Sequence, residues 1–202
     1  MGLLAERGAT GRHDLATDVN SGPFERTTIA EIAAAARVVK KTVTNYFPRK
    51  EGMALDHQEE FAASLARTVA AREPGESVVA ALRRAFRAAV AAQDPVAGFA
   101  GQEFSRMVAE SPTLSACLRG LHDRREAAPA GALAEATGTD AGDIAPRTAA
   151  ALLGGVHRVL FTRIQELTLA GHENAEIAAN LAEETTLAFD LVEPAPTDYA
   201  VA

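Results

Sequence analysis

The sequence predicts an all-α fold, with three short helices at the N-terminus followed by a set of longer helices. Hydrophobic residues make up 48% of the 202 residues, which is enough for a substantial core. Alanine is abundant, tryptophan is absent and strong strand formers rarely occur in runs, a composition that favours helices. Apolar side chains recur at three- and four-residue spacing, and glycine or proline interrupts these stretches.

The positive charge of this acidic chain is concentrated near its N-terminus. The formal net charge is −7, yet residues 1–55 hold eight Lys and Arg against six Asp and Glu. All three lysines, Lys40, Lys41 and Lys50, lie in one segment, and residues 37–50 contain no acidic residue. A local basic patch can bind phosphates while an acidic remainder repels DNA elsewhere.

The chain has a single cysteine, Cys117, so an internal disulfide is impossible. That fits a reducing cytosol. No apolar run approaches the length of a membrane span, and no charged-then-apolar leader opens the chain. The sequence therefore predicts a cytoplasmic protein with no membrane partner.

The first three predicted helices are short. The first lies within residues 1–22 and is weakly patterned, because Gly8 and Gly11 interrupt it. The second begins at Thr28, where Thr28-x-x-Glu31 forms a capping box. Its apolar face comprises Ile29, Ile32, Ala33 and Ala36.

A turn at residues 37–38 leads to the third helix, predicted over residues 39–47, and Pro48 ends it. The 100° step of a helix divides its side chains into two faces. The face expected to be buried comprises Val39, Val43, Tyr46 and Phe47. The opposite face comprises Lys41, Thr44 and Asn45.

Six longer helices and a tail are predicted for the remainder. Their apolar spacing and breaks place the helices at residues 49–72, 77–93, 99–110, 113–136, 147–170 and 174–192. Residues 194–202 include two prolines and are predicted to be disordered.

Two short helices joined by a tight turn, with a basic exposed face, are what a helix-turn-helix reader of DNA requires. A helix fits the major groove, where its side chains reach base edges. Lys40 and Lys41 can meet guanine acceptors or phosphates, and Asn45 can pair with adenine. Thr42 and Thr44 can bond phosphates or touch thymine methyl groups. The alternative interpretation is a solvated basic helix face with a packing role only.

The same segment carries a known motif. Its residues are Phe24-x-x-Thr27-Thr28-Ile29-x-x-Ile32-Ala33 and Thr42-Val43-x-Asn45-Tyr46-Phe47-Pro48-x-Lys50-Glu51. This pattern resembles the TetR family of bacterial transcriptional repressors. The resemblance implies a homodimer with an N-terminal DNA-binding domain at residues 1–48 and a helical effector-binding and dimerisation domain at residues 49–193. It also implies that a small-molecule effector separates the two DNA-reading heads and releases the operator.

The candidate DNA contacts fall into two groups by the hydrogen bonds that their side chains can make. Each dimer is expected to place two recognition helices about one DNA turn apart, roughly 34–36 Å, on a pseudo-palindromic operator. The predicted groove contacts are Lys40, Lys41, Thr42, Thr44 and Asn45. The predicted phosphate contacts are Thr27, Thr28, Tyr46 and Lys50. Lys50 is included because it lies at the start of the next predicted helix, whose N-terminus also favours negative charge.

The turn departs from the family pattern. The family usually has Ala-Gly-Val-Ser where this chain has Ala36-Arg37-Val38-Val39. Arg37 in a left-handed conformation is expected to cost about 1 kcal/mol. Val39 cannot cap the next helix, a loss of about 1 kcal/mol. Thr44 also stands where the family often has an aromatic residue.

The last two predicted helices are the candidate dimer interface, since paired helices from two subunits can form a four-helix bundle. Gly154 and Gly155 lie inside the first of them and predict a close approach of helices. The alternative is that both helices complete one subunit's core.

The central helices supply candidates for the effector pocket. An apolar cavity with few polar groups suits an apolar or amphipathic effector, although each residue could equally be ordinary core. The candidates are Phe61, Phe86, Phe99, Phe104, Met107, Cys117, Leu121, His122 and Phe161.

Two other functions remain open at this stage. A helical small-molecule carrier or sensor with weak or lost DNA binding would explain Arg37, Val39 and the weak first helix. An enzyme is disfavoured because the histidines are scattered, and no metal site or cofactor is predicted.

Overall fold

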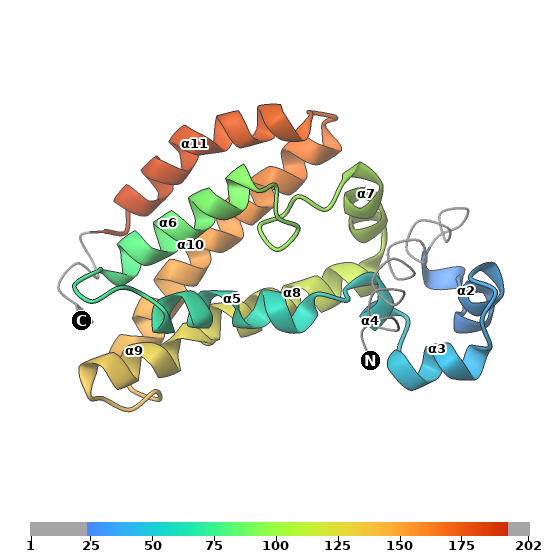
Figure 1. Ribbon diagram of the computed structural model, residues 1–202, viewed down its shortest axis with the longest axis horizontal. Coiled ribbons are helices and arrows are strands. Elements are labelled where there is room, and N and C mark those ends of the chain that lie inside the picture. The colour runs from blue at the N-terminus through green and yellow to red at the C-terminus, as the bar shows by residue number, and fades with distance from the viewer. Residues whose placement is uncertain (1–23, 194–202) are drawn as a thin grey trace. The chain divides into compact units, whose positions relative to one another are not determined.

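The computed structural model describes residues 24–193, and within that range every regular element is a helix (Figure 1). The predicted all-α class is thereby confirmed. The predicted first helix and the predicted disordered tail lie outside the described residues.

Packing divides the chain into two compact units. The first unit comprises Met1–Gln58 and Arg106–Leu118, and the second unit comprises Glu59–Ser105 and Arg119–Ala202. The functional boundary expected after residue 48 stays a prediction, because packing alone does not identify the residues that bind DNA or effector.

The first unit contains the predicted pair of short helices. Thr28 caps the first of them as expected: its backbone N–H donates to Glu31 Oε2 at 2.8 Å, and the Glu31 N–H donates to Thr28 Oγ1 at 3.3 Å. The helices α2 and α3 pack against each other. The elements are η1 (Phe24–Arg26), α2 (Ile29–Ala35), α3 (Lys40–Tyr46) and α4 (Glu51–Ala54).

The second unit is built around its longest helix, α10, which packs against α9 and α11, while α11 also packs against α6 (Figure 1). The chain changes unit within α7 (Gln102–Glu110) and within α8 (Pro112–Ala127). The remaining elements are α5 (Gln58–Ala70), α6 (Val78–Ala91), α9 (Pro129–Thr137), α10 (Ile144–Leu169) and α11 (Asn174–Asp190). The most deeply buried side chains of the second unit include Val69, Leu82, Leu153, Ile164, Ile177, Leu181 and Phe189.

Arginine side chains link the helices of the second unit at its surface. Arg83 of α6 contacts Asp190 of α11 at 2.6 Å, and Arg163 of α10 contacts Glu184 of α11 at 3.1 Å. Exposed pairs of this kind contribute roughly 0–1 kcal/mol each, so burial of the apolar core is the larger source of stability.

The single helix predicted at residues 49–72 is wrong. The chain instead forms α4 and α5, separated by residues 55–57. Leu55 has φ −114° and ψ 53°, outside the helical region. Asp56 and His57 follow, and neither residue type favours a helix interior.

The single helix predicted at residues 113–136 is also wrong, because α8 ends at Ala127 and α9 begins at Pro129. A proline has no N–H to donate, and its ring clashes with the carbonyl four residues earlier. Pro129 is accepted here as the first residue of a new helix, where its missing N–H costs nothing.

Two helix starts differ from prediction by three residues. The helix α7 starts at Gln102 rather than residue 99, because Gly98 and Gly101 have φ of 129° and 82°, outside the helical region. The helix α10 starts at Ile144, and its first turn accommodates Pro146.

The predicted close approach of helices occurs at Gly154 and within one chain. A Cβ added to Gly154 would lie 2.5 Å from Cγ and 2.7 Å from Cα of Glu126 on α8. The same addition at Gly155 meets no atom within 4 Å. Gly154 therefore sets the packing of α8 on α10, whereas Gly155 faces open space.

Candidate DNA-reading surface and effector region

The turn between α2 and α3 contains a strained residue. Arg37 has φ +54°, the left-handed conformation that favours glycine. The backbone N–H of Val38 donates to the Ala33 carbonyl at 2.9 Å and closes the turn. The expected left-handed turn is confirmed, and a side chain at this position costs about 1 kcal/mol.

Replacing Val39 with serine is expected to raise the free energy of unfolding by about 1 kcal/mol. Val39 is the N-cap of α3 and makes no side-chain capping bond. Its side chain is 71% exposed, so little packing is lost. A serine Oγ could accept a first-turn N–H. Urea unfolding of Val39→Ser against Val39→Ala isolates the cap, and equal stability of the two variants would contradict the prediction.

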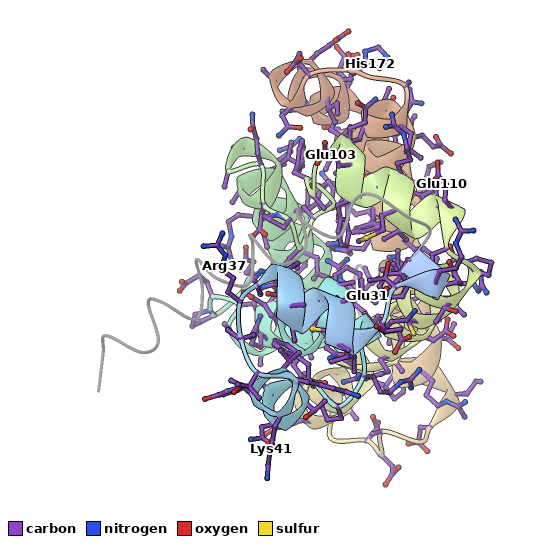
Figure 2. The ribbon with its side chains drawn as sticks, turned by 90° about the vertical axis from the view of Figure 1, so that its right-hand side faces the viewer. Glu31, Arg37, Lys41, Glu103, Glu110 and His172 are labelled. Carbon is purple, nitrogen blue, oxygen red and sulfur yellow. The ribbon has the colours of Figure 1, made fainter. Side chains whose placement is uncertain are left out.

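The outer face of α3 presents the predicted base-reading side chains. Lys40, Lys41, Thr42 and Asn45 are exposed, while Val43 is buried and anchors the helix. Figure 2 shows Lys41 extending outward from the helix. The four polar side chains come from one short helix, so they form a single patch of donors and acceptors.

The predicted buried face of α3 is wrong at two of its four positions. Val39 is 71% exposed and Tyr46 is 77% exposed, and Phe47 is half-buried. Val39 is an extended residue before the helix, and Tyr46 is the last helical residue, so neither lies over the core. The Tyr46 phenol is therefore accessible for its predicted phosphate contact.

Thr44 differs from the other predicted groove residues. Its side chain is half-buried, and its Oγ1 donates to the carbonyls of Lys40 at 3.3 Å and Lys41 at 3.1 Å. A threonine commonly makes this bond to the preceding turn. The hydroxyl is thus held by its own helix.

Lys50 is engaged inside the first unit. Its Nζ donates to the carbonyl of Phe24 at 2.7 Å and lies 4.5 Å from the centre of the Phe24 ring. It also donates to the carbonyls of Glu25 at 3.0 Å and Thr27 at 3.1 Å. An ammonium has three N–H donors, so all are used. Lys50 fixes the entry to α2, and its phosphate contact stays a prediction.

Neighbouring groups hold the same entry segment. The Thr28 hydroxyl donates to Glu31 Oε2 at 2.8 Å, so this predicted phosphate contact already serves as a cap. Glu25 Oε1 accepts from the Ser111 hydroxyl at 2.7 Å, and this bond holds the pKa of the Glu25 carboxyl below its usual range. The start of α8 therefore belongs to the first unit.

Three of the predicted effector-lining side chains meet in the second unit. The ring centroids of Phe61 and His122 are 5.0 Å apart, those of His122 and Phe161 are 4.8 Å apart, and those of Phe61 and Phe161 are 5.5 Å apart. All three pairs are edge-to-face, the arrangement that aromatic rings favour. These side chains come from α5, α8 and α10.

Residues 20–56 match the profile described as "Bacterial regulatory proteins, tetR family". This range contains the capping box, the turn, α3 and Lys50. The chain carries the DNA-binding domain of the TetR family. The matched range covers the whole motif between Phe24 and Glu51, so the predicted resemblance of this helix-turn-helix segment to the family is confirmed.

A search of curated protein sequences gives no match. Among solved structures, one similar chain is the TetR family repressor AlkX from Dietzia sp. strain DQ12-45-1b, implicated in biodegradation of n-alkanes. The two chains are 19% identical with a TM-score of 0.48, and the similarity covers 94% of this chain and 95% of the other.

The remaining predicted lining residues of this TetR-type chain are dispersed. The ring centroid of Phe86 lies 5.4 Å from that of His157, in an edge-to-face arrangement. Phe99 is buried in the loop before α7, and Leu121 is buried on α8. The residues Phe104, Met107 and Cys117 are half-buried, and the last two belong to the first unit.

Sequence reasoning missed Arg125, which joins the aromatic trio. Its guanidinium carbon lies 4.4 Å from the centre of the Phe61 ring, and its Nε–H donates to Ser64 Oγ at 3.0 Å. The run Asp-Arg-Arg-Glu at residues 123–126 is typical of a solvated surface. The position of Arg125 four residues after buried Leu121 was the available signal for burial.

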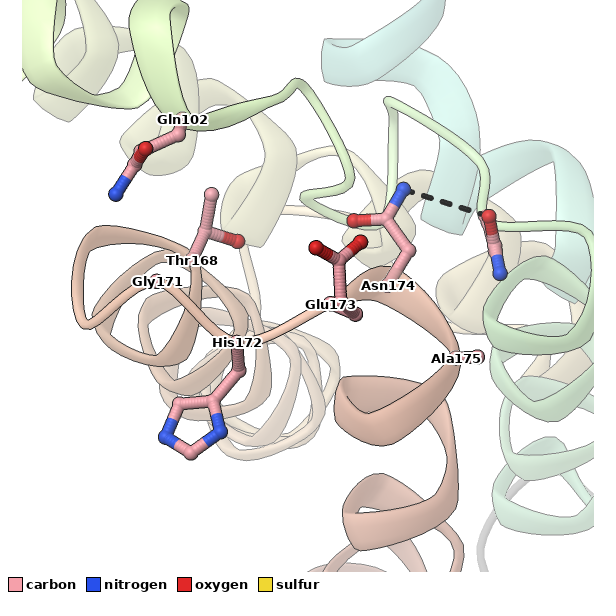
Figure 3. A pocket seen from close by; sticks show the side chains of 8 residues that line it. Gln102, Thr168, Gly171, His172, Glu173, Asn174 and Ala175 are labelled. Carbon is pink, nitrogen blue, oxygen red and sulfur yellow. Dashed lines mark hydrogen bonds between the residues drawn. The ribbon is translucent and has the colours of Figure 1, made fainter.

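A polar cavity of about 500 Å³ lies in the second unit near the loop between α10 and α11 (Figure 3). Asn174 Nδ2 donates to Gln93 Oε1 across part of its wall at 3.3 Å. None of the predicted effector-lining residues lines this cavity. Its lining comprises Gln93, Gln102, Thr168, Gly171, His172, Glu173, Asn174 and Ala175.

The described part of the chain contains no candidate for a membrane-spanning helix or for a metal site. Between residues 24 and 193, no helix is long and apolar enough to cross a membrane. In the same range, no three His, Cys, Asp or Glu side chains gather in a way that could hold a metal ion.

Proposed function

We propose that this TetR-type regulator is a repressor that binds a pseudo-palindromic operator as a homodimer and releases it on binding a small amphipathic effector. The observation that carries the proposal is the exposed patch of Lys40, Lys41, Thr42 and Asn45 on α3, inside a domain of known DNA-binding type. Such a protein acts in the cytoplasm, where its operator lies.

The proposed docking places α3 in the major groove. The Asn45 amide can donate to and accept from the adenine edge, and each lysine can donate to guanine acceptors or phosphates. Tyr46 and Thr27 lie beside the expected phosphates. Lys50 holds the carbonyls of Phe24 and Thr27 and so positions Thr27 for its phosphate contact. A direct bond from Lys50 to phosphate would require it to release one of these carbonyls.

The proposed dimer interface is the outer face of α10 and α11. Both helices expose large apolar side chains, which monomeric proteins seldom gather on one surface. The exposed fractions are 41% for Leu152 and 65% for Val159 on α10, 63% for Leu187 on α11, and 75% for Leu191, which directly follows α11. Pairing these helices with those of a second copy would cover them in a four-helix bundle.

The proposed effector region is the set of Phe61, His122 and Phe161, together with Arg125. These side chains lie in the second unit, apart in sequence from the residues that read DNA. An effector bound there would alter the packing of α5, α8 and α10 without touching DNA. Such a separation of sites is what ligand-dependent release requires.

The proposal is tested by binding the purified protein to the intergenic DNA upstream of its own gene. Asn45→Ala is expected to lower affinity for the specific site by about 1–3 kcal/mol and to relax one base position. Affinity for competitor DNA should change little. The matched control is Asn174→Ala in the second unit, which should bind like the wild type.

The salt dependence separates this proposal from its rival. Tight binding with a steep salt slope supports an operator-specific dimer. Equal, weak binding to every DNA fragment, with Asn45→Ala unchanged, would overturn the repressor. The helical carrier with weak DNA binding would then be favoured, consistent with strained Arg37 and uncapped α3.

A further inference from the structure

The core of the second unit contains basic side chains and no acidic ones. His122, Arg125 and His157 are buried, with exposed fractions of 7%, 4% and 2%. Within residues 24–193, no aspartate or glutamate is buried. Proteins rarely bury a charge without a partner of opposite sign, because the desolvated ion is unstable.

Arg125 is the charged member of this group. Burial lowers the pKa of Arg125 to about 10, and the charge of Asp94 opposes that change, so the guanidinium remains a cation at neutral pH. It forms no salt bridge with any side chain of the described range. Of its five N–H donors, only Nε–H has an acceptor there, the Ser64 hydroxyl.

The two histidines are neutral and lack polar partners. Burial, followed by repulsion from Arg125, lowers the pKa of His122 to about 4. Within the described range, no hydrogen bond to either ring nitrogen of His122 is present. Both ring nitrogens of His157 are fully buried without a hydrogen bond, and its ring packs between Phe86 and Phe189. A neutral imidazole offers one donor and one acceptor.

We propose that Arg125 binds the carboxylate of an organic anion whose apolar body lies against Phe61 and Phe161. The planar guanidinium matches a carboxylate with two parallel hydrogen bonds. His122 contacts both phenylalanine rings and can donate to the same anion. The idea that such a ligand triggers operator release rests on the proposed function. The binding of the carboxylate by Arg125 does not depend on it.

The competing interpretation gives Arg125 a structural role only. Its stacking on Phe61 and its bond to Ser64 would then hold α8 against α5. The two interpretations differ in what happens when the charge is removed. A structural latch should lose stability, whereas an uncompensated ion should not, because a methionine of similar volume removes the desolvated charge and keeps the packing.

The first experiment uses the full-length wild-type protein and matched probes. Decanoate is compared with decan-1-ol, and 4-phenylbutyrate with 4-phenylbutan-1-ol, by thermal shift and calorimetry. At least one carboxylate is expected to bind about tenfold or more tightly than its alcohol, as for hydrogen bonds to a charged group. If neither carboxylate is preferred over its alcohol, the proposal is wrong.

The second experiment changes the arginine. Arg125→Met is expected to remove the carboxylate preference while the ligand-free melting temperature stays the same or rises. The matched control is Arg124→Met, because Arg124 is the adjacent residue and makes an exposed pair with Glu59 at 3.0 Å. The control should keep the preference. If Arg125→Met keeps the carboxylate preference, the proposal is wrong. It is also wrong if Arg125→Met has a lowered melting temperature while Arg125→Lys binds the carboxylate as tightly as the wild type.

Operator binding is measured separately on the same preparations. If the wild type binds its operator but shows no carboxylate preference, the inference fails and the repressor stands. If carboxylates bind in an Arg125-dependent way but no DNA is recognised, the inference stands and the repressor fails.

Discussion

Replacing Val159 with arginine is expected to convert the proposed dimer into monomers and to lower operator affinity at least a hundredfold. Val159 lies near the middle of α10 and is 65% exposed. In the proposed bundle it faces its own copy across the two-fold axis, so the substitution brings two desolvated positive charges together. Two linked reading heads gain about 10²–10⁴ in affinity over one head, and a monomer loses that gain.

Light scattering and operator titration on the same samples check this result. The matched control is Ile144→Arg, because Ile144 is an even more exposed apolar residue at the start of α10, about 22 Å away along the helix axis. The control should remain dimeric. If Val159→Arg stays dimeric with unchanged operator affinity, the outer face of α10 is not the interface.

Adding a single methyl group at Gly154 is expected to lower the free energy of unfolding by about 1–3 kcal/mol, and a valine there by more. The added Cβ would lie 2.7 Å from the backbone Cα of Glu126, so moving one side chain cannot relieve the clash. The helices α8 and α10 would have to separate. The ion pair between Arg158 and Asp123, which joins the same two helices at 2.7 Å, should weaken with them.

Urea unfolding measures the effect of Gly154→Ala against Gly120→Ala. Gly120 lies exposed on α8, and a Cβ added to it meets nothing within 4 Å. An alanine there should therefore stabilise the helix by about 0.5–1 kcal/mol. Opposite signs for the two substitutions are expected. A Gly154→Ala protein as stable as the wild type would mean that α8 and α10 separate without loss.

The features predicted correctly from the sequence are those that neighbouring residues determine. Thr28 and Glu31 form a capping box because the two partners are one helical turn apart. Arg37 adopts a left-handed conformation because the short turn between two helices requires it. Pro129 is an equally local signal for a helix break, but the predicted helix at residues 113–136 ran through it. In the structure, the helix is broken there.

The candidate sites were predictable only in part, because their geometry depends on contacts between distant segments. The aromatic side chains of the central helices were candidates for lining a pocket, and Phe61 and Phe161 were among them. The sequence did not reveal that these two rings pack with His122 and not with Phe86. Lys50 was placed on phosphate by its position at a helix start. The three carbonyls that it binds lie 23 to 26 residues away in sequence, so no local pattern revealed them.

The engagement of Lys50 also divides the lysines of this chain by chemical reactivity. An amine nitrogen attacks through its lone pair, but three carbonyls surround the Lys50 nitrogen and accept its hydrogens. Acylating reagents should therefore spare Lys50 in the folded protein. The other two lysines, Lys40 and Lys41, are exposed and begin α3. Amine acylation of the native protein would thus neutralise charge on lysine side chains only at α3, the helix proposed to face DNA.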